Sequence, residues 1–428
     1  MDEANKIPHK DIRKLYRPRI IDPMISDLLR IMGGVQINGC KWCGKTWTGV
    51  YHSNSSAFIG TESNRKLAEM DPELILKGET PRLIDEWQDV PDLKDVARMN
   101  IDLSNKKGMY IFTGSSVPRQ TSASHSGTGR FANITMRPMS LFESGDSNGS
   151  VSLSGLFNGN TAVSSLSKMD YATAVHLICK GGWPGGLGMS GRDALKIPRL
   201  YCGSLIHSDF SQIDGIKRNP DTMKRLLASL ARNNATAAGT SVLAADMAKG
   251  DAPVSEQTVR SYTDILKRVF VIEEQNAWLP SLRSKKRMRT SPKVHFTDPS
   301  LAAACMEAGT DALLNDPNTA GFLFESLCYR DLSVYSSAFG GRVSYYLDNS
   351  GLEVDSVVEY GDGRWGAVEV KMGYKETDRA AANLLRLKNK LTGEAPEPSF
   401  MMVLCATGGA AYKRDDGVLV VPADCLGP

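Results

Sequence analysis

The sequence predicts a multidomain α/β protein whose N-terminal part folds around a parallel sheet. Its 428 residues exceed what a single domain usually holds. Between about residues 30 and 145, strand-like runs alternate with polar helical stretches. The run Gly39–Thr46 lies between a strand-like and a helix-forming segment and has the spacing G-x-x-x-x-G-K-[ST]. The expected domains are 1–160, 161–310 and 311–428.

Five strand-like runs define the sheet of the first domain. Each is followed by a polar stretch long enough for a helix that crosses back over the sheet. The expected strands are Gly34–Asn38, Ala57–Gly60, Arg82–Glu86, Met109–Thr113 and Ile134–Met136. The Ser-, Gly- and Asn-rich stretch 145–160 is expected to be a loop.

The run Gly39–Thr46 has the pattern of a phosphate-binding loop. Its glycines let backbone N–H groups curl around a phosphate, Lys45 reaches the terminal phosphates, and the Thr46 hydroxyl can hold Mg²⁺. The alternative is a chance match in a glycine-containing turn. The expected nucleotide contacts are Gly39, Cys40, Lys41, Trp42, Cys43, Gly44, Lys45, Thr46 and Trp47.

An acidic pair ends the third predicted strand, about 40 residues after this loop. Asp85 is expected to hold Mg²⁺, directly or through water, and Glu86 to polarise the attacking water as general base. At the tip of the fourth strand, Thr113 is the first candidate for sensing the γ-phosphate and Ser115 the second. The alternatives are a helix N-cap for the acidic pair and a plain turn for the strand tip.

Two arginines lie near the fifth predicted strand. Arg130 follows a Gly-rich loop, and Arg137 comes just after the strand. An arginine presented to the nucleotide cancels charge during phosphoryl transfer, in the same chain or across a subunit interface. Arg130 is the first candidate and Arg137 the second, and a surface or ion-pair role is the alternative. A role across an interface predicts a homo-oligomer.

Together these motifs resemble bacterial and archaeal AAA-type ATPases that carry a C-terminal domain of unknown function. The resemblance covers nearly the whole chain and implies ATP and Mg²⁺ as cofactors. ATP is favoured over GTP because the sequence has no Asn-Lys-x-Asp run for guanine. Cys40 departs from the proline usual in the family, which should alter the rigidity of the loop more than its phosphate chemistry. The residues that carry the resemblance are 16–22, 41–46, 85–88, 113–115, 129–131 and 137–143.

The composition argues against several classes of protein. No stretch approaches the ~18 apolar residues of a membrane span, and the charged N-terminus lacks the apolar core of a secretory signal. The eight cysteines are scattered, as expected of reduced thiols in a cytoplasmic protein. Cys40 and Cys43 form a C-x-x-C, which a redox pair or half a metal site also shows, but their place inside the loop favours a filling role. The net charge of +3 is too small to indicate nucleic acid by itself.

The middle region has the element order of a winged helix. An amphipathic helix is expected at 221–230 and a short one at 242–247, and Ser255 should cap a third helix that precedes a strand at 270–274. The exposed start of the third helix is the candidate base-contacting surface. Its candidate contact residues are Gln257 and Arg260.

A basic run follows this strand. It puts five positive charges into seven residues, a cluster suited to neutralising the phosphates of a nucleic acid. DNA is therefore a candidate partner. The alternatives are a winged helix that packs as a lid and a basic run that is only a solvated loop. The five charges are Arg283, Lys285, Lys286, Arg287 and Arg289.

The C-terminal region contains two alternating runs, 352–359 and 365–371, which predict a β-hairpin. The charged side chains of the two strands share one face, because side chains alternate along a strand. The pairs expected to face each other are Asp355 with Glu369 and Glu353 with Lys371.

An Asp followed by Glu-x-Lys on the neighbouring strand resembles the site of PD-(D/E)XK nucleases. That resemblance implies that Asp355 and Glu369 bind Mg²⁺ and that Lys371 positions or activates water. Glu325, in a helical run, matches the helix-borne acid that often completes such sites. The alternatives are a solvated charge ladder and a nuclease-like fold retained for binding.

These observations favour an ATP-hydrolysing AAA-type protein that couples its nucleotide state to a winged-helix region and a nuclease-like C-terminal region, with DNA as its target. Two alternatives stay open. One is a nucleotide-gated regulator or scaffold that binds a protein or DNA without cleaving it. The other is an ATP-controlled, metal-dependent nuclease.

Overall fold

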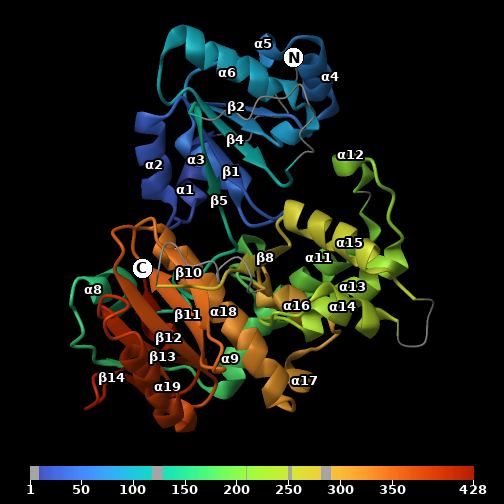
Figure 1. Cartoon of the computed structure of the whole chain (residues 1–428). Coiled ribbons are helices and arrows are strands. Elements are labelled where there is room, and N and C mark those ends of the chain that lie inside the picture. The colour runs from blue at the N-terminus through green and yellow to red at the C-terminus, as the bar shows by residue number, and fades with distance from the viewer. Residues whose placement is uncertain (1–8, 118–128, 209, 249–252, 281–290) are drawn as a thin grey trace. The chain divides into compact units, whose positions relative to one another are not determined.

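The computed structural model describes residues 9–117, 129–208, 210–248, 253–280 and 291–428 (Figure 1). Its internal contacts divide the chain into two compact units. Unit 1 comprises Met1–Pro138, Asp209–Lys217 and Ile265–Phe270, and unit 2 comprises Met139–Ser208, Arg218–Asp264 and Val271–Pro428. The regions 161–310 and 311–428 thus lie mostly in one unit, and the domain boundaries expected at 160 and 310 stay predictions.

Unit 1 is built on a five-stranded, fully parallel sheet of order β2-β3-β4-β1-β5. The strands are β1 (Gly34–Asn38), β2 (Ser55–Phe58), β3 (Arg82–Asp85), β4 (Tyr110–Gly114) and β5 (Phe131–Thr135). All five predicted strands are present. Because β4 lies between β1 and β3, the carboxyl ends of these three strands meet at one edge of the sheet.

Helices cover both faces of this sheet, as a parallel sheet requires. Leu83 of β3 points to the face covered by the helix after β1, where Gly49 permits close packing, since a Cβ there would lie 2.7 Å from Leu83 Cδ1. Ile84, the next residue, joins the core of the opposite face. The helices of this unit are α1 (His9–Leu15), α2 (Asp22–Ile31), α3 (Lys45–His52), α4 (Glu62–Met70), α5 (Pro72–Leu76), α6 (Asp92–Ser104) and α12 (Ser211–Asp214).

Unit 2 contains a seven-stranded mixed sheet of order β10-β11-β12-β13-β15-β14-β7. Leu384 and Leu387 of helix α19 (Thr377–Lys390) pack against Trp365 and Val403 of this sheet in one apolar core. The strands are β10 (Arg342–Leu347), β11 (Glu353–Glu359), β12 (Trp365–Lys371), β13 (Phe400–Cys405), β14 (Ala410–Lys413), β15 (Leu419–Pro422) and β7 (Ser165–Leu166).

The predicted hairpin is β11 paired with β12. Its expected register is present from Glu359 opposite Trp365 to Ser356 opposite Val368. The paired ladder ends there, so the two strands separate before they reach Asp355.

Helices dominate the remainder of unit 2. Helices α13, α14 and α15 are followed by the antiparallel pair β8 and β9, the element order expected from the sequence, and Ser255 Oγ accepts a bond of 3.1 Å from Thr258 N–H at the start of α15. The winged-helix assignment itself stays a prediction. The elements are α9 (Tyr171–Lys180), α10 (Gly191–Ala194), α11 (Lys196–His207), α13 (Pro220–Arg232), α14 (Thr240–Met247), α15 (Glu256–Arg268, of which the part from Ile265 belongs to unit 1), β8 (Ile272–Gln275), β9 (Lys293–Phe296), α16 (Pro299–Cys305), α17 (Thr310–Leu314) and α18 (Pro317–Ser337).

The stretch 145–160 is not wholly a loop, and that prediction was wrong. It contains strand β6 (Val151–Ser152), which pairs with β16 (Leu426–Gly427), and helix α8 (Leu153–Phe157), which follows the short helix α7 (Leu141–Ser144). The apolar residues spaced among its serines and glycines are buried, and this burial outweighs the turn-forming composition.

None of the described helices is long and apolar enough to cross a membrane.

Candidate functional site

The predicted phosphate-binding loop connects β1 to α3 at the edge where the strand ends meet. Gly39 is needed for close approach, because a Cβ there would lie 2.2 Å from Met136 O. Gly44 adopts a φ of 105° at the start of α3, a conformation that favours glycine. Lys45 begins the helix, is only 5% exposed, and its Nζ lies 2.8 Å from Cys40 O inside the loop. The N–H groups of the first turn of α3 therefore face the position expected for a phosphate.

Two cysteine thiols fill the space beneath this loop. Cys40 and Cys43 are both buried, and neither is in a disulfide. A hydrogen bond from Cys40, assisted by the nearby charges of Lys45 and Arg19, lowers the pKa of Cys43 to about 6 despite its burial. Cys43 Sγ also lies 3.5 Å from Met136 O. These contacts agree with the filling role.

A hydroxyl–carboxylate cluster lies beside the loop. Asp85 ends β3, and the sheet register places Thr113 of β4 directly opposite it. Thr46 Oγ1 and Thr113 Oγ1 donate to the same oxygen, Asp85 Oδ1, at 2.9 and 2.5 Å. Burial, reinforced by the charge of Glu86, raises the pKa of Asp85 to about 6, and the hydroxyl bonds oppose this shift. Hydroxyl and carboxylate oxygens are the ligands that Mg²⁺ prefers, so this cluster fits the expected cation.

Glu86 leaves the strand in a left-handed conformation, with φ 57°. Its Oε2 accepts a bond of 2.9 Å from Ser115 Oγ and a second bond from Gln88 Nε2. The two candidates for γ-phosphate sensing thus contact different acids: Thr113 contacts Asp85, and Ser115 contacts Glu86.

The two candidate arginines lie at opposite ends of β5, an edge strand of the sheet. Arg130 precedes β5, its carbonyl accepts a bond from Gly34 N–H, and its Nε lies 2.7 Å from Asp102 Oδ1. The five residues of β1 separate it from the loop by about 17 Å. Arg130 therefore cannot serve the loop of its own chain, and only its role across a subunit interface stays a prediction. Arg137 follows the carboxyl end of β5, on the side of the sheet where the phosphate-binding loop lies.

Arg19 is a residue of this site to which the sequence assigned no role. It is 5% exposed, and its guanidinium donates to Cys43 O and to Arg137 O, both at 2.9 Å. It therefore ties the loop to the segment that follows β5. The only signal in the sequence was its place in the motif 16–22.

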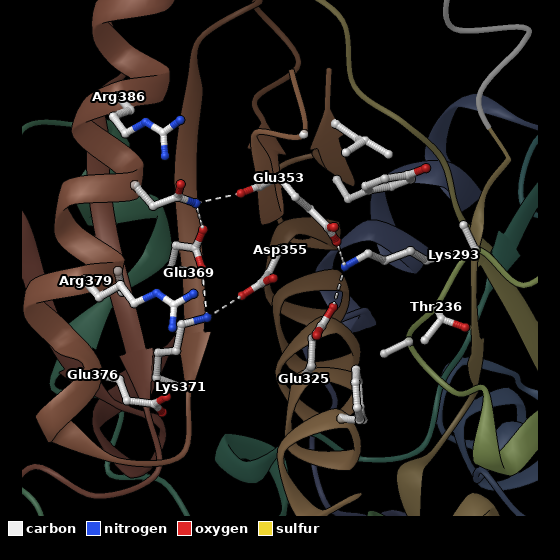
Figure 2. Close-up of a pocket in the computed structure, with 18 of the residues that line it drawn as sticks. Thr236, Lys293, Glu325, Glu353, Asp355, Glu369, Lys371, Glu376, Arg379 and Arg386 are labelled. Atoms are coloured by element: carbon white, nitrogen blue, oxygen red, sulfur yellow. Dashed lines mark hydrogen bonds and ion pairs between the residues drawn. The ribbon is translucent and has the colours of Figure 1, made fainter. Parts of the chain in front are cut away.

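Unit 2 contains a pocket of about 730 Å³ where β11 and β12 separate (Figure 2). All four candidate nuclease residues line it, although they come from α18, β11 and β12. Lys371 Nζ lies 3.0 Å from Glu369 Oε2 and 3.5 Å from Asp355 Oδ2, so its ammonium bridges the two carboxylates. Asp355 Oδ2 also accepts a bond from Val370 N–H at 2.8 Å. The four residues are Glu325, Asp355, Glu369 and Lys371.

A second lysine bridges the other two acids of the pocket. Lys293 of β9 is 5% exposed, and its Nζ lies 2.8 Å from Glu325 Oε1 and 2.6 Å from Glu353 Oε1. The predicted pairings of Asp355 with Glu369 and of Glu353 with Lys371 were both wrong, because the ladder ends before these residues. Lys293 lies about 60 residues before Glu353 in the chain, and no local pattern marked it.

Two acids of the pocket, Glu325 and Glu369, hold their protons more tightly than usual. Burial, followed by the charge of Asp355, raises the pKa of Glu325 to about 7 and that of Glu369 to about 8. Burial favours the neutral amine of Lys371, but the carboxylates outweigh it and hold its pKa above the usual value. Burial, with the nearby carboxylate of Asp355, therefore favours the protonated form of these two acids.

The donor set of the pocket fits a hydrated Mg²⁺ ion. Mg²⁺ usually keeps several waters and takes one or two carboxylates, which Asp355 and Glu369 supply. In the described part of the chain, no group of three or more His, Cys, Asp or Glu side chains is arranged to hold a metal ion.

The nucleic-acid candidates of the middle region are only partly described. Gln257 and Arg260 are exposed on α15, and Arg260 Nη2 lies 3.5 Å from Glu256 Oε2. The predicted basic cluster lies outside the described residues. Its members are Arg283, Lys285, Lys286, Arg287 and Arg289.

Comparison with protein families divides the chain into three matched regions. Residues 34–144 match a family model described as an AAA domain. Residues 172–312 and 320–426 match two models described as domains of unknown function, DUF8612 and DUF4143. An uncharacterised protein of Mycobacterium tuberculosis and one of Mycobacterium bovis are each 24% identical over 361 residues, which is 83% of this chain and 71% of theirs.

Two solved structures resemble the chain more distantly. The Walker-type ATPase of Pyrococcus abyssi is 14% identical, with a TM-score of 0.42, over 71% of this chain and 99% of that one. The Orc1 protein of Aeropyrum pernix, solved in complex with DNA, is 11% identical, with a TM-score of 0.26, over 74% and 94%. At these TM-scores the likenesses carry no argument about function. The strand order, the loop and the matched family model together identify residues 34–144 as a domain of the AAA-type P-loop ATPase fold.

Proposed function

We propose that the protein binds Mg–ATP at the loop 39–46 and hydrolyses it. The observation that carries this proposal is the hydroxyl–carboxylate cluster, in which Thr46 after β1 and Thr113 at the end of β4 converge on Asp85 at the end of β3. A turn that matched the loop pattern by chance would not bring these three strand ends together.

The residues of the site take separate roles in this proposal. The N–H groups of the loop and Lys45 bind the phosphates. Thr46 and Asp85 would hold Mg²⁺, which when bound would supply charge neutralisation at the phosphates. Glu86 accepts a proton from the attacking water. It must first exchange its bonds to Ser115 and Gln88 for one to that water.

Two substitutions test the assignment of these roles. Lys45→Ala should abolish ATP binding, because it removes the ammonium that reaches the phosphates. Glu86→Gln should bind ATP but lose turnover by about 10²-fold or more, because an amide is no general base. Binding is followed by the fluorescence of two exposed tryptophans, Trp42 in the loop and Trp47 in the first turn of α3, and turnover by phosphate release.

Matched surface variants control for general effects. Lys66→Ala and Glu62→Gln alter an exposed ion pair of α4 and should leave binding and turnover unchanged. Wild-type turnover in Glu86→Gln would overturn the assignment of the base.

A second candidate function is metal-dependent cleavage of a nucleic acid in the pocket of unit 2. It is favoured by the bridging of Asp355 and Glu369 by Lys371, which brings two carboxylates and one lysine to the same point. In this proposal the carboxylates hold Mg²⁺, which supplies Lewis-acid chemistry when bound, and Lys371 orients the attacking water. DNA is the proposed target, and a protein partner is the alternative.

The coupling of the two activities belongs to the same proposal. Phosphate release is measured with duplex DNA, single-stranded DNA, RNA or no addition, and each nucleic acid is then examined on a gel. Stimulated turnover supports a nucleic-acid-coupled ATPase, and fragments that disappear in Lys371→Ala support cleavage. Basal turnover with intact nucleic acid favours a nucleotide-gated regulator. If Arg130 acts across a subunit interface, the protein must form a homo-oligomer. Dilution would then dissociate the oligomer, and turnover per chain would fall.

A further inference from the structure

Helix α19 presents two arginines and an asparagine to the pocket of unit 2. Arg379, Asn383 and Arg386 all line it, and their spacing of four and three residues places them on one face of the helix. Figure 2 shows Arg379 and Arg386 extending from this helix toward the strand that carries Glu369 and Lys371. The neighbouring face of α19 is buried in the core of the sheet.

The two arginines differ from the other polar residues around them. Asn383 Nδ2 donates to Glu353 O and to Glu369 Oε1, so it has a role in positioning the acids. Lys388, on the same helix, lies 2.7 Å from Glu397. Arg379 and Arg386 are exposed and, within the described part of the chain, form no ion pair or side-chain hydrogen bond. Their charges are thus available to an anion from solution.

The size of the pocket limits that anion. At about 730 Å³ it has the volume of a small-molecule site, which suits part of a single strand and not a duplex. Seven residues of helix separate the arginines by about 10 Å along the axis. Roughly three nucleotides of a stacked strand span the same distance, at 3.4 Å each. Phe322, 43% exposed, also lines the pocket and offers a ring on which a base can stack.

We infer that Arg379 and Arg386 bind two phosphates of one single strand of nucleic acid and hold that strand beside the carboxylates of the pocket. The inference rests on the second candidate function, since it names the ligand of the same pocket. Guanidinium groups suit phosphate because they donate two parallel hydrogen bonds. The two guanidinium groups would add positive charge beside carboxylates that are already engaged by Lys371 and Lys293, and this charge favours the approach of a phosphate.

The experiment measures the salt dependence of binding by the full chain. A fluorescent oligothymidylate is titrated by anisotropy in EDTA, so that no strand is cleaved. Each lost phosphate contact should reduce the slope of log K against log[salt] by about 0.7 for a single strand. Arg379→Ala and Arg386→Ala should each show this reduction, and the double variant about twice as much. Arg379→Lys should restore most of the slope, and Lys388→Ala should leave it unchanged.

The outcomes separate this inference from the nuclease proposal. Unchanged slopes in the arginine variants, or no binding by the wild type, overturn the inference. Inorganic tripolyphosphate that competes as well as the oligonucleotide overturns the choice of a strand as ligand. If the slopes fall as expected but Mg²⁺ or Mn²⁺ yields no fragments, the strand-binding wall stands and the cleavage proposal fails.

Discussion

At the scale of single residues, Arg19 is the clearest case of a side chain whose role depends on its surroundings. It is buried and donates to two backbone carbonyls, one in the phosphate-binding loop and one after β5. Removing it leaves both carbonyls without this partner, and each buried unsatisfied group costs about 1–3 kcal/mol.

We expect Arg19→Ala to weaken ATP binding by at least tenfold, because the loop loses its tie to the rest of the site. Arg19→Lys should recover little of this loss, since one ammonium does not reproduce the two-pronged contact. Binding is measured by titration of tryptophan fluorescence. Arg17→Ala, at an exposed position nearby, is the control. Equal affinity in Arg19→Ala and the wild type would show that the tie does not shape the loop.

Lys293 supplies a cation inside the acidic pocket. Its ammonium neutralises Glu325 and Glu353, which would otherwise attract a metal ion. We expect Lys293→Met to tighten Mn²⁺ binding several-fold, as measured by the paramagnetic resonance of free Mn²⁺. Lys388→Met removes a lysine outside the pocket and should have no effect. Weaker binding in Lys293→Met would mean instead that Lys293 organises the metal ligands.

The raised pKa of Glu369 predicts a dependence of stability on pH. Its pKa rises from an ordinary value of 4.5 to about 8 on folding, so the folded state binds more protons between these values. The free energy of unfolding should therefore fall as the pH rises from 5 to 8. Urea unfolding at several pH values should show a smaller fall in Glu369→Gln than in the wild type. A difference between the two proteins that is constant with pH would contradict the shift.

At the scale of elements, the segment 137–143 begins the short helix α7 and bonds it to the long helix α18. Ser140 and Glu143 form a capping box at the start of α7, and Leu141 N–H donates to Asp331 Oδ2 of α18 at 3.0 Å. Asp331 in turn pairs with Arg330, which is buried at 2% exposure and also contacts Asp298. The second half of the segment 137–143 therefore has a structural role, because its backbone bonds to a buried ion-pair network.

We expect Asp331→Ala to destabilise the protein by about 3–5 kcal/mol, because it leaves Arg330 with one partner in the interior. Unfolding in urea measures the change. Asp362→Ala, in the exposed turn of the hairpin, should cost far less. A loss below about 1 kcal/mol for Asp331→Ala would show that Asp298 alone satisfies the guanidinium.

At the scale of the whole molecule, the two candidate sites belong to different compact units. Amide exchange can therefore distinguish the ligands of the two sites. We expect Mg–ATP to slow exchange at 39–46 and 85–88 through bonds to the loop and the acidic pair. Mn²⁺ without nucleotide should slow exchange at 353–371. Lys45→Ala should lose the first effect and keep the second. Protection of 353–371 by ATP would instead reveal coupling between the sites.

The loop 39–46 and the parallel sheet were predictable because their signals are local. The spacing of glycines, lysine and threonine in the loop, and the placing of Asp85 after three charged or apolar strand residues, each lie within one short segment. The hairpin register was also predictable where the strands stay paired, since alternation of side chains sets it. Composition was misleading only where buried apolar residues stand among serines and glycines, as at 151–157.

By itself, the sequence determined where the loop 39–46 and the acidic pair lie along the chain, and which acids and lysine gather at the C-terminal hairpin. Only the tertiary structure decided that Arg130 lies at the end of β5 away from the loop, that Arg19 holds the loop, and that Lys293 pairs with Glu353. The reason is that these relations join segments far apart in the chain. They depend on the order of the strands in the sheet and on the point where two strands stop pairing. Neither can be predicted from the spacing of residues within one segment.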